Sequence, residues 1–149
     1  EDIMGIVIID LENTISDARH RMWLLKYDGD DELLKEEYNR QFQEGFIYDD
    51  INMNVKMFIS SLIKKGHMIT ILTAKHEKYR SMVTEWLYKF EISFDSLVMK
   101  TNHSDSDLEF KRSFASHNRE LIDFALDDVG SMCAMYSEYN IPCLRIEQK

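Results

Sequence analysis

Three short, mostly apolar runs each end abruptly at a polar side chain, and this pattern constrains the fold more than any other feature. The runs are Ile6–Ile9, Met68–Leu72 and Ile122–Leu126, and the polar residues that follow them are Asp10, Thr73 and Asp127-Asp128. Such runs are typical of strands buried on both faces, as in a parallel sheet covered by helices. Ligands of these sheets bind beyond the carboxyl ends of the strands. The polar residues are therefore candidates for one site.

Segments with helical spacing separate the runs. Residues 16–50 predict one or two helices that end near Gly45, and a further helix ends at Lys64-Lys65-Gly66. The same reasoning places helices at 76–90, 107–119 and 129–139, and short strands at 96–99 and 143–146. Alternating strands and helices predict an α/β fold with a parallel sheet and right-handed crossovers.

Length and charge limit the function classes. The chain has 149 residues and a net charge of −9, so we expect a single domain over residues 1–149. Extensive duplex binding usually needs a basic surface, but one nucleotide or strand end can bind in a local basic pocket. Neither a membrane-length apolar run nor a signal peptide is visible, and the two cysteines form no metal or disulfide motif. A cytoplasmic location is the expectation.

Two acidic positions are candidates for catalysis or metal binding. Asp10 follows a buried strand, which suits a nucleophile or metal ligand, although a helix cap or turn is the ordinary role of such a residue. Asp127 and Asp128 repel each other unless a cation lies between them or a pKa rises. Mg²⁺ would relieve that repulsion, whereas a solvated acidic turn would not need it.

Thr73 and Lys111 are candidates for phosphate binding. Thr73 offers a hydroxyl and a backbone N–H to a phosphate oxygen, or it caps the next helix. Asp107 and Lys111 lie four positions apart, so they form either an ordinary surface ion pair or a lysine oriented for phosphate by its acidic partner.

Four segments in this order resemble the motifs of the haloacid dehalogenase-like (HAD) phosphatases. They are Asp10-Leu11-Glu12-Asn13-Thr14, Ile71-Leu72-Thr73-Ala74, Lys111 and Asp127-Asp128. The resemblance spans residues 6–146. Within that family, the chain most resembles the 3′-phosphatase domain of bacteriophage-type polynucleotide kinases. The similar features are Leu97-Val98-Met99-Lys100, the pair Asp107 and Lys111, the helix after Asp128, and Arg21, which lies eleven residues after Asp10. That branch often has an arginine where Lys75 stands here.

The resemblance implies a three-layer, Rossmann-like parallel sheet with a core at 5–15 and 53–147 and a short helical cap at about 16–52. It also implies a mechanism. Asp10 would attack phosphorus to form an aspartyl-phosphate, and Mg²⁺ would be held by Asp10, the Glu12 backbone carbonyl, Asp127 and Asp128. Thr73 and Lys111 would stabilise the transferring phosphoryl group.

The remaining residues that the resemblance implies contact or orient the substrate. Arg21 and Lys75 would hold its second phosphate or its sugar, and Asp107 would orient Lys111. Thr14 and Ala74 complete the predicted substrate-binding set.

Glu12 departs from the family pattern, in which the second acid is Asp. That acid protonates the leaving oxygen and then activates water. Glutamate is longer by one methylene, and a displacement of about 1 Å can cost on the order of 10²-fold in rate. Asn13 replaces the usual glycine and tolerates the left-handed backbone that an adjusted loop requires.

The expected function is a Mg²⁺-dependent phosphomonoesterase. Its substrate would be a polynucleotide 3′-phosphate, which the branch favours, or a free nucleotide or other small phosphate, which the negative charge favours. A degenerate binding or regulatory module, which binds Mg²⁺ without turnover, is the alternative that Glu12 raises. A receiver-like signalling domain fits less well, because its acidic pair usually precedes the nucleophile. The sequence leaves the oligomeric state open.

Overall fold

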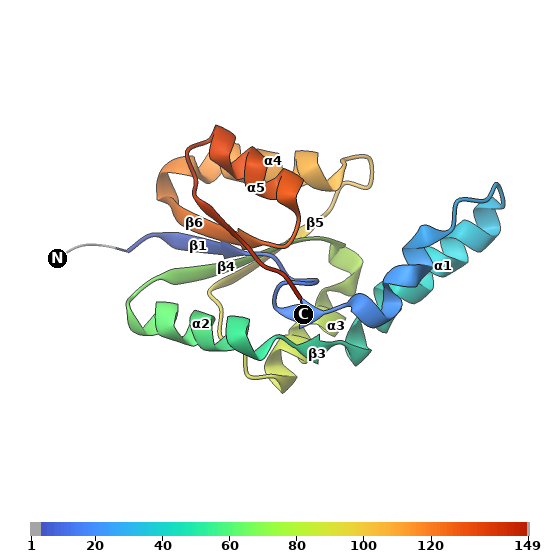
Figure 1. Ribbon diagram of the computed structural model, residues 1–149, viewed down its shortest axis with the longest axis horizontal. Coiled ribbons are helices and arrows are strands. Elements are labelled where there is room, and N and C mark those ends of the chain that lie inside the picture. The colour runs from blue at the N-terminus through green and yellow to red at the C-terminus, as the bar shows by residue number, and fades with distance from the viewer. Residues whose placement is uncertain (1–3, 149) are drawn as a thin grey trace.

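The computed structural model describes residues 4–148 and shows a sheet between two helical layers (Figure 1). Residues 1–3 and 149 of the predicted single domain lie outside the described part. The helices are α1 (Glu32–Glu44), α2 (Met53–Lys64), α3 (Arg80–Lys89), α4 (Asp107–Asn118) and α5 (Gly130–Glu138). The strands are β1 (Ile6–Ile9), β2 (Ser16–Asp17), β3 (Asp50–Ile51), β4 (Met68–His76), β5 (Ser96–Lys100), β6 (Ile122–Asp127) and β7 (Cys143–Arg145). Short 3₁₀ helices are η1 (Arg19–Lys26), η2 (Gly45–Tyr48), η3 (Glu77–Tyr79) and η4 (Arg119–Leu121).

The main sheet has the strand order β5-β4-β1-β6-β7, and every neighbouring pair in it is parallel. In the central strand β1, Ile9 pairs with Ile71 of β4 and with Leu126 of β6. The backbone N–H of Asp10 then donates to the carbonyl of Leu126. This register brings the carboxyl ends of β1, β4 and β6 to one edge. Together with the helices on both faces, the parallel sheet confirms the predicted three-layer α/β fold class.

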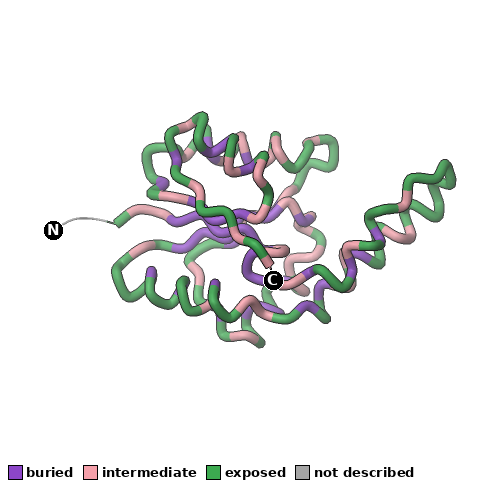
Figure 2. The backbone as a smooth tube through the Cα atoms, in the orientation of Figure 1, coloured by how far each residue is buried: buried purple, intermediate pink, exposed green. Residues whose placement is uncertain are grey.

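The sheet is buried on both faces. Val7 and Ile9 of β1 pack in one apolar cluster with α2 and α3, and Ile8 packs in a second cluster with α4 and α5. Figure 2 shows the buried residues concentrated in the central strands. Successive side chains of a strand point to opposite faces, so a strand covered on both sides must be apolar at every position. The continuous run Ile6–Ile9 meets that requirement.

The start of α4 is fixed by a capping box. The Ser106 hydroxyl accepts from the backbone N–H of Glu109, and the Glu109 carboxylate accepts from the backbone N–H of Ser106. Such a box satisfies two backbone donors that a helix start would otherwise leave unpaired. It fixes where α4 begins, and Lys111 follows in its second turn.

Several elements differ from the sequence expectation. The helix expected at 76–90 is α3 (Arg80–Lys89), which follows the 3₁₀ helix η3. The strand predicted to end at Thr73 continues to His76, because the pairing of β4 with β5 resumes at His76 and Lys100 after a register shift. The polar residues of this extension do not give a strand pattern. The first helix expected within residues 16–50 is the 3₁₀ helix η1, which has no side-chain cap.

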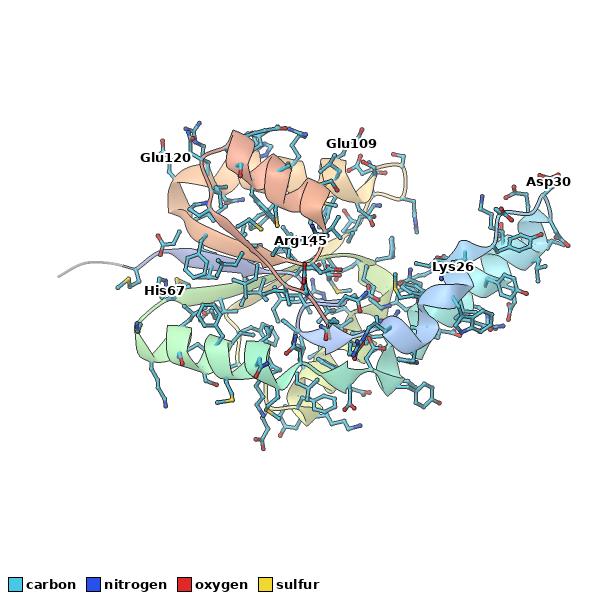
Figure 3. The ribbon with its side chains drawn as sticks, in the orientation of Figure 1. Lys26, Asp30, His67, Glu109, Glu120 and Arg145 are labelled. Carbon is cyan, nitrogen blue, oxygen red and sulfur yellow. The ribbon has the colours of Figure 1, made fainter. Side chains whose placement is uncertain are left out.

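Residues 16–52 leave and rejoin the core through the antiparallel pair β2 and β3, in which Ser16 pairs with Ile51 and Asp17 with Asp50. Between them, η1 and α1 lie side by side and extend away from the sheet as an arm (Figure 1). Most of this arm is exposed (Figure 2), and Asp30 lies at its tip (Figure 3). That the arm acts as a cap remains a prediction.

Over residues 4–148, no helix combines the length and the apolar character needed to cross a membrane.

Candidate active site

A pocket of about 390 Å³ lies at the carboxyl edge of β1, β4 and β6. Its lining includes most of the residues that the sequence singles out: Asp10, Glu12, Thr73, Ala74, Lys75, Asp107, Lys111, Asp127 and Asp128. Thr14 and Arg21 lie outside this lining. The sheet register and the start of α4 together explain why residues so distant in the sequence meet here.

Lys111 bridges two buried carboxylates in this pocket. Its Nζ donates to Oδ1 of Asp10 and to Oδ2 of Asp127, both at 2.7 Å. Burial raises the pKa of Asp10 to about 7, against the opposing charge of Lys111. Burial also disfavours the charged form of Lys111, but the charges of Asp10 and Asp127 outweigh it and raise the lysine pKa. The ammonium of Lys111 is therefore a permanent positive charge inside the pocket.

Three carboxylates in the pocket could hold a metal ion. Asp10, Asp127 and Asp128 each offer an oxygen, and these oxygens lie within 4.8 Å of one another. Burial raises the pKa of both Asp127 and Asp128, which a bound cation would offset. Carboxylate oxygens are the ligands that Mg²⁺ prefers, so the donor set fits the predicted ion. The side chain of Glu12 is not part of this cluster, and its predicted backbone ligand stays a prediction.

Thr14 supports Asp10 from outside the pocket lining, and its predicted contact with substrate stays a prediction. Its side chain is fully buried, and its hydroxyl donates to Oδ2 of Asp10 at 3.1 Å. The turn that brings it there passes through Asn13, whose φ of 63° lies in the left-handed region. The expectation that Asn13 adopts this conformation is confirmed.

Arg21 is engaged by protein groups, and its predicted contact with a substrate stays a prediction. It is 2% exposed, and its Nε and Nη2 donate to the two carboxylate oxygens of Asp49 at 2.8 and 2.6 Å. Nη1 donates to the carbonyl of Phe42. Nη2 also lies 2.7 Å from Oε2 of Glu12. A buried guanidinium needs such partners, so Arg21 holds Glu12 from behind the pocket.

Lys75 lines the pocket but is also engaged by the protein. Its Nζ donates to the backbone carbonyl and to the side-chain oxygen of Gln43, both at 2.8 Å, and it lies 3.9 Å from Oε2 of Glu12. Burial lowers the pKa of Lys75 to about 8. Lys75 is thus held against α1, and its predicted contact with a second substrate phosphate stays a prediction.

Asp107 does not orient Lys111, although the two lie four positions apart on α4. Asp107 is exposed, and its carboxylate pairs with Nζ of Lys100 at 3.2 Å. Lys111 is buried and turns toward the sheet edge, where Asp10 and Asp127 supply two nearer carboxylates. The pairing prediction was wrong because the buried acids outcompete a solvated one.

Thr73 lines the pocket and lies in β4 just before the register shift toward His76. Its side-chain oxygen accepts from the backbone N–H of Lys75 at 3.1 Å, which leaves its own O–H available as a donor.

Asp49 and Gln43 are the residues that sequence reasoning missed. Asp49 is 3% exposed and accepts from Arg21 and from the Ser16 hydroxyl. No motif or spacing marks it. Gln43 lies on α1 and, with Met22 and Leu25 of η1, gives the arm a share of the pocket wall. That these arm residues line the pocket can be seen only once the chain is folded.

Similar solved structures support the fold. No protein-family profile and no curated protein sequence matches this chain. A chain of the Pnkp1/Rnl/Hen1 RNA repair complex superimposes with a TM-score of 0.77 and 22% identity over 99% of this chain. The present chain spans only 46% and 44% of the matched chains in two structures of that complex.

Two smaller proteins superimpose over most of both chains. A predicted phosphatase from Clostridium acetobutylicum gives a TM-score of 0.71 with 13% identity, over 97% of this chain and 85% of that one. A HAD family enzyme from Bacteroides thetaiotaomicron, in complex with magnesium and inorganic phosphate, gives 0.56 and 13%, over 95% and 93%. The chain therefore has the fold of the haloacid dehalogenase-like phosphatases.

Proposed function

We propose that this protein is a Mg²⁺-dependent phosphomonoesterase with Asp10 as its nucleophile. The observation that carries the proposal is the convergence of Asp10, Thr73, Lys111 and Asp127 on one pocket from β1, β4, α4 and β6. A carboxylate, a hydroxyl and a buried ammonium side by side can receive and stabilise a phosphoryl group.

The reaction would proceed in two displacements. A carboxylate oxygen of Asp10 attacks phosphorus, and the bond from phosphorus to the leaving oxygen breaks as that oxygen takes a proton from Glu12. The aspartyl-phosphate is then attacked at phosphorus by water, whose proton returns to Glu12. Inorganic phosphate leaves, and the Asp10 carboxylate is regenerated.

Lys111 and Thr73 would bind the phosphoryl oxygens. The ammonium of Lys111 has three donors, and Asp10 and Asp127 take two of them. The third remains for a phosphate oxygen. The free hydroxyl of Thr73 donates to another. Both groups are fixed by the fold before substrate arrives, which is the condition for electrostatic stabilisation of a transition state.

Asp10, Asp127 and Asp128 would hold Mg²⁺, with the backbone carbonyl of Glu12 as the further predicted ligand. When bound, Mg²⁺ neutralises charge on the phosphate and holds it in place.

The substrate class we propose is a phosphorylated nucleotide or nucleic-acid 3′ end. Similarity to a chain of an RNA repair complex supports a strand end, whereas the net charge of −9 disfavours long duplexes.

The test is release of inorganic phosphate in the presence of Mg²⁺ from a 3′-phosphorylated oligonucleotide, 3′- and 5′-mononucleotides and an aryl phosphate. Release that is lost with EDTA and with Asp10→Asn supports the phosphatase. Asparagine has nearly the same shape as aspartate, but its one acceptor oxygen can meet either Lys111 or Thr14, so the Tm of Asp10→Asn is measured beside its activity.

A binding or regulatory module is the second candidate, and the engagement of Glu12 by Arg21 is the observation that favours it. Mg²⁺ binding without phosphate release from any of the four substrates would support this function and overturn the phosphatase.

A further inference from the structure

A second, smaller pocket opens beside the first. Its volume is about 200 Å³, and it is formed by the end of β4, the helix η3 and the segment that follows β5. Asn39, Gln43, Ala74 and Asp107 line both pockets. We call this second pocket the annex. We call the pocket that contains Asp10 the reaction pocket. Because the annex shares a wall with the reaction pocket, one ligand can occupy both.

The annex is basic although the chain is acidic. Four of its lining residues carry basic side chains, namely His76, Lys78, Lys100 and His103, and Asp107 is its one acidic lining residue. In a chain with a net charge of −9, this lining holds more basic than acidic side chains. A cleft lined by one sign of charge raises the local concentration of ions of the opposite sign.

Most of these groups are not neutralised by the protein. Lys100 pairs with Asp107. Lys78 and the two histidines have no ion pair within residues 4–148, and the Nζ of Lys78 lies 5.2 Å from the ring centre of Tyr79. His76 accepts at Nδ1 from the backbone N–H of Lys78 at 3.0 Å, so its proton is on Nε2 and can be donated to a ligand.

The wall of the annex is built from packed rings. His76 and His103 stack with centroids 3.9 Å apart and an angle of 8° between their planes. This contact joins the loop after β5 to the end of β4. The two histidines are therefore held together by the fold.

We propose that the annex binds a second phosphate group of the substrate while the reaction pocket holds the phosphate to be removed. This inference rests on the proposed function. It predicts that a substrate with two phosphates is preferred to one with a single phosphate. The second phosphate can be the internucleotide diester of a polynucleotide 3′ end or the 5′-phosphate of a nucleoside 3′,5′-bisphosphate.

The experiment compares phosphate release from thymidine 3′-phosphate, thymidine 3′,5′-bisphosphate and a thymidine dinucleotide that carries a 3′-phosphate. For the wild type we expect KM to be about tenfold or more lower for at least one two-phosphate substrate, equivalent to about 1.4 kcal/mol. Preference for the dinucleotide identifies the diester, and preference for the bisphosphate identifies the 5′-phosphate. Equal KM values for all three would overturn the proposal.

The variant Lys78→Gln/Lys100→Gln tests the residues. It should erase the KM preference for the second phosphate, whereas Lys64→Gln, at the end of α2 near the start of β4 and so at the opposite edge of the sheet, should keep it. Lys78→Gln alone, at an exposed position, should reduce the preference even if the double variant folds poorly. An unchanged preference in the variants contradicts the assignment to the annex.

A binding measurement separates failure of the annex from failure of the phosphatase. Calorimetric titration of Asp10→Asn with thymidine 3′,5′-bisphosphate and thymidine 3′-phosphate needs no turnover. Tighter binding of the bisphosphate that is lost in Asp10→Asn/Lys78→Gln supports the annex even without hydrolysis. Equal binding of both ligands refutes it even if hydrolysis occurs.

Discussion

The ammonium of Lys111 lies 2.7 Å from Oδ1 of Asp10, although 101 positions separate the two residues in the chain. The same ammonium lies 2.7 Å from Oδ2 of Asp127. Lys111 thus compensates two buried negative charges before any ligand arrives. Removing the charge of Lys111 should therefore reveal how far the acidic cluster lowers the free energy of unfolding.

We expect Lys111→Gln to lower phosphate release by at least about 10²-fold, because a preorganised donor to the phosphoryl group is lost. Loss of one partner from a buried ion pair should also lower the free energy of unfolding by about 3–5 kcal/mol. Mg²⁺ should restore part of it, so the rise in Tm on adding Mg²⁺ should be larger than in the wild type. Differential scanning calorimetry with Mg²⁺ or with EDTA measures the loss of stability and the Tm response to Mg²⁺.

Arg112→Gln is the matched control for that variant. Arg112 is the next residue on α4, but its ion pair with Glu138 is exposed to solvent, and such pairs contribute about 0–1 kcal/mol. An equal Mg²⁺ response in Lys111→Gln and in the wild type would contradict the compensating role of Lys111.

Without metal, the stability of the protein should fall as the pH rises from about 4 to about 7. Burial raises the pKa of Asp10 from 3.8 to about 7 in the folded state. The folded state therefore binds this proton more tightly than the unfolded state does. That stabilisation is fully present below pH 3.8 and is lost as the pH rises through the folded-state pKa.

Urea unfolding in EDTA across this pH range tests the prediction. Asp10→Asn should flatten the dependence, because the titrating group is gone. A profile that is equally steep in the variant would assign the effect to other groups, such as Asp127 and Asp128, whose pKa values burial also raises.

Shortening Glu12 to aspartate should lower the rate. Arg21 holds the Glu12 carboxylate at 2.7 Å, and one methylene less moves that carboxylate by about 1 Å, which can cost on the order of 10²-fold. We therefore expect Glu12→Asp to reduce kcat up to about 100-fold and Glu12→Gln to abolish turnover, and the Tm of Glu12→Gln to fall less than that of Asp49→Ala because Arg21 keeps Asp49. A faster Glu12→Asp enzyme would show instead that the glutamate is misplaced.

Asp49→Ala should be strongly destabilising. Its carboxylate is the main partner of the buried Arg21 guanidinium and also accepts from Ser16. Removing one partner of a buried ion pair costs about 3–5 kcal/mol. Asp50→Ala, at the exposed neighbouring position, should change the unfolding free energy by about 0.5 kcal/mol or less. Chemical denaturation of both variants gives the comparison, and equal effects would contradict the structural role of Asp49.

Much of the core could be predicted from the sequence because its pattern is local. Ile6–Ile9 is apolar at every position because both faces of β1 are covered, and Gly66, with a φ of 96°, follows the end of α2. The pocket positions of Asp10, Thr73, Lys111 and Asp127 follow from the strand ends and from the family resemblance. The pattern that marks each of these positions is carried by its immediate neighbours in the sequence.

The partners of the site residues could not be predicted, because they depend on long-range contacts. Arg21 is 28 positions from Asp49, and Lys75 is 32 from Gln43. Spacing suggested that Asp107 would pair with Lys111, but it could not show that the buried acids of β1 and β6 lie nearer. The continuation of β4 to His76, which builds the annex, carries polar residues that do not resemble a buried strand.

The arm formed by η1 and α1 enters and leaves the core through neighbouring residues, since Asp17 pairs with Asp50. The spacing of the main sheet therefore places no limit on its length, and its outer half can be exchanged without disturbing the strands. The base of the arm, where Phe42 and Gln43 meet Arg21 and Lys75, must stay. Such an architecture is modular: under the proposed function, a foreign helical hairpin grafted beyond that base is expected to change which molecules reach Asp10 while the other pocket residues stay in place.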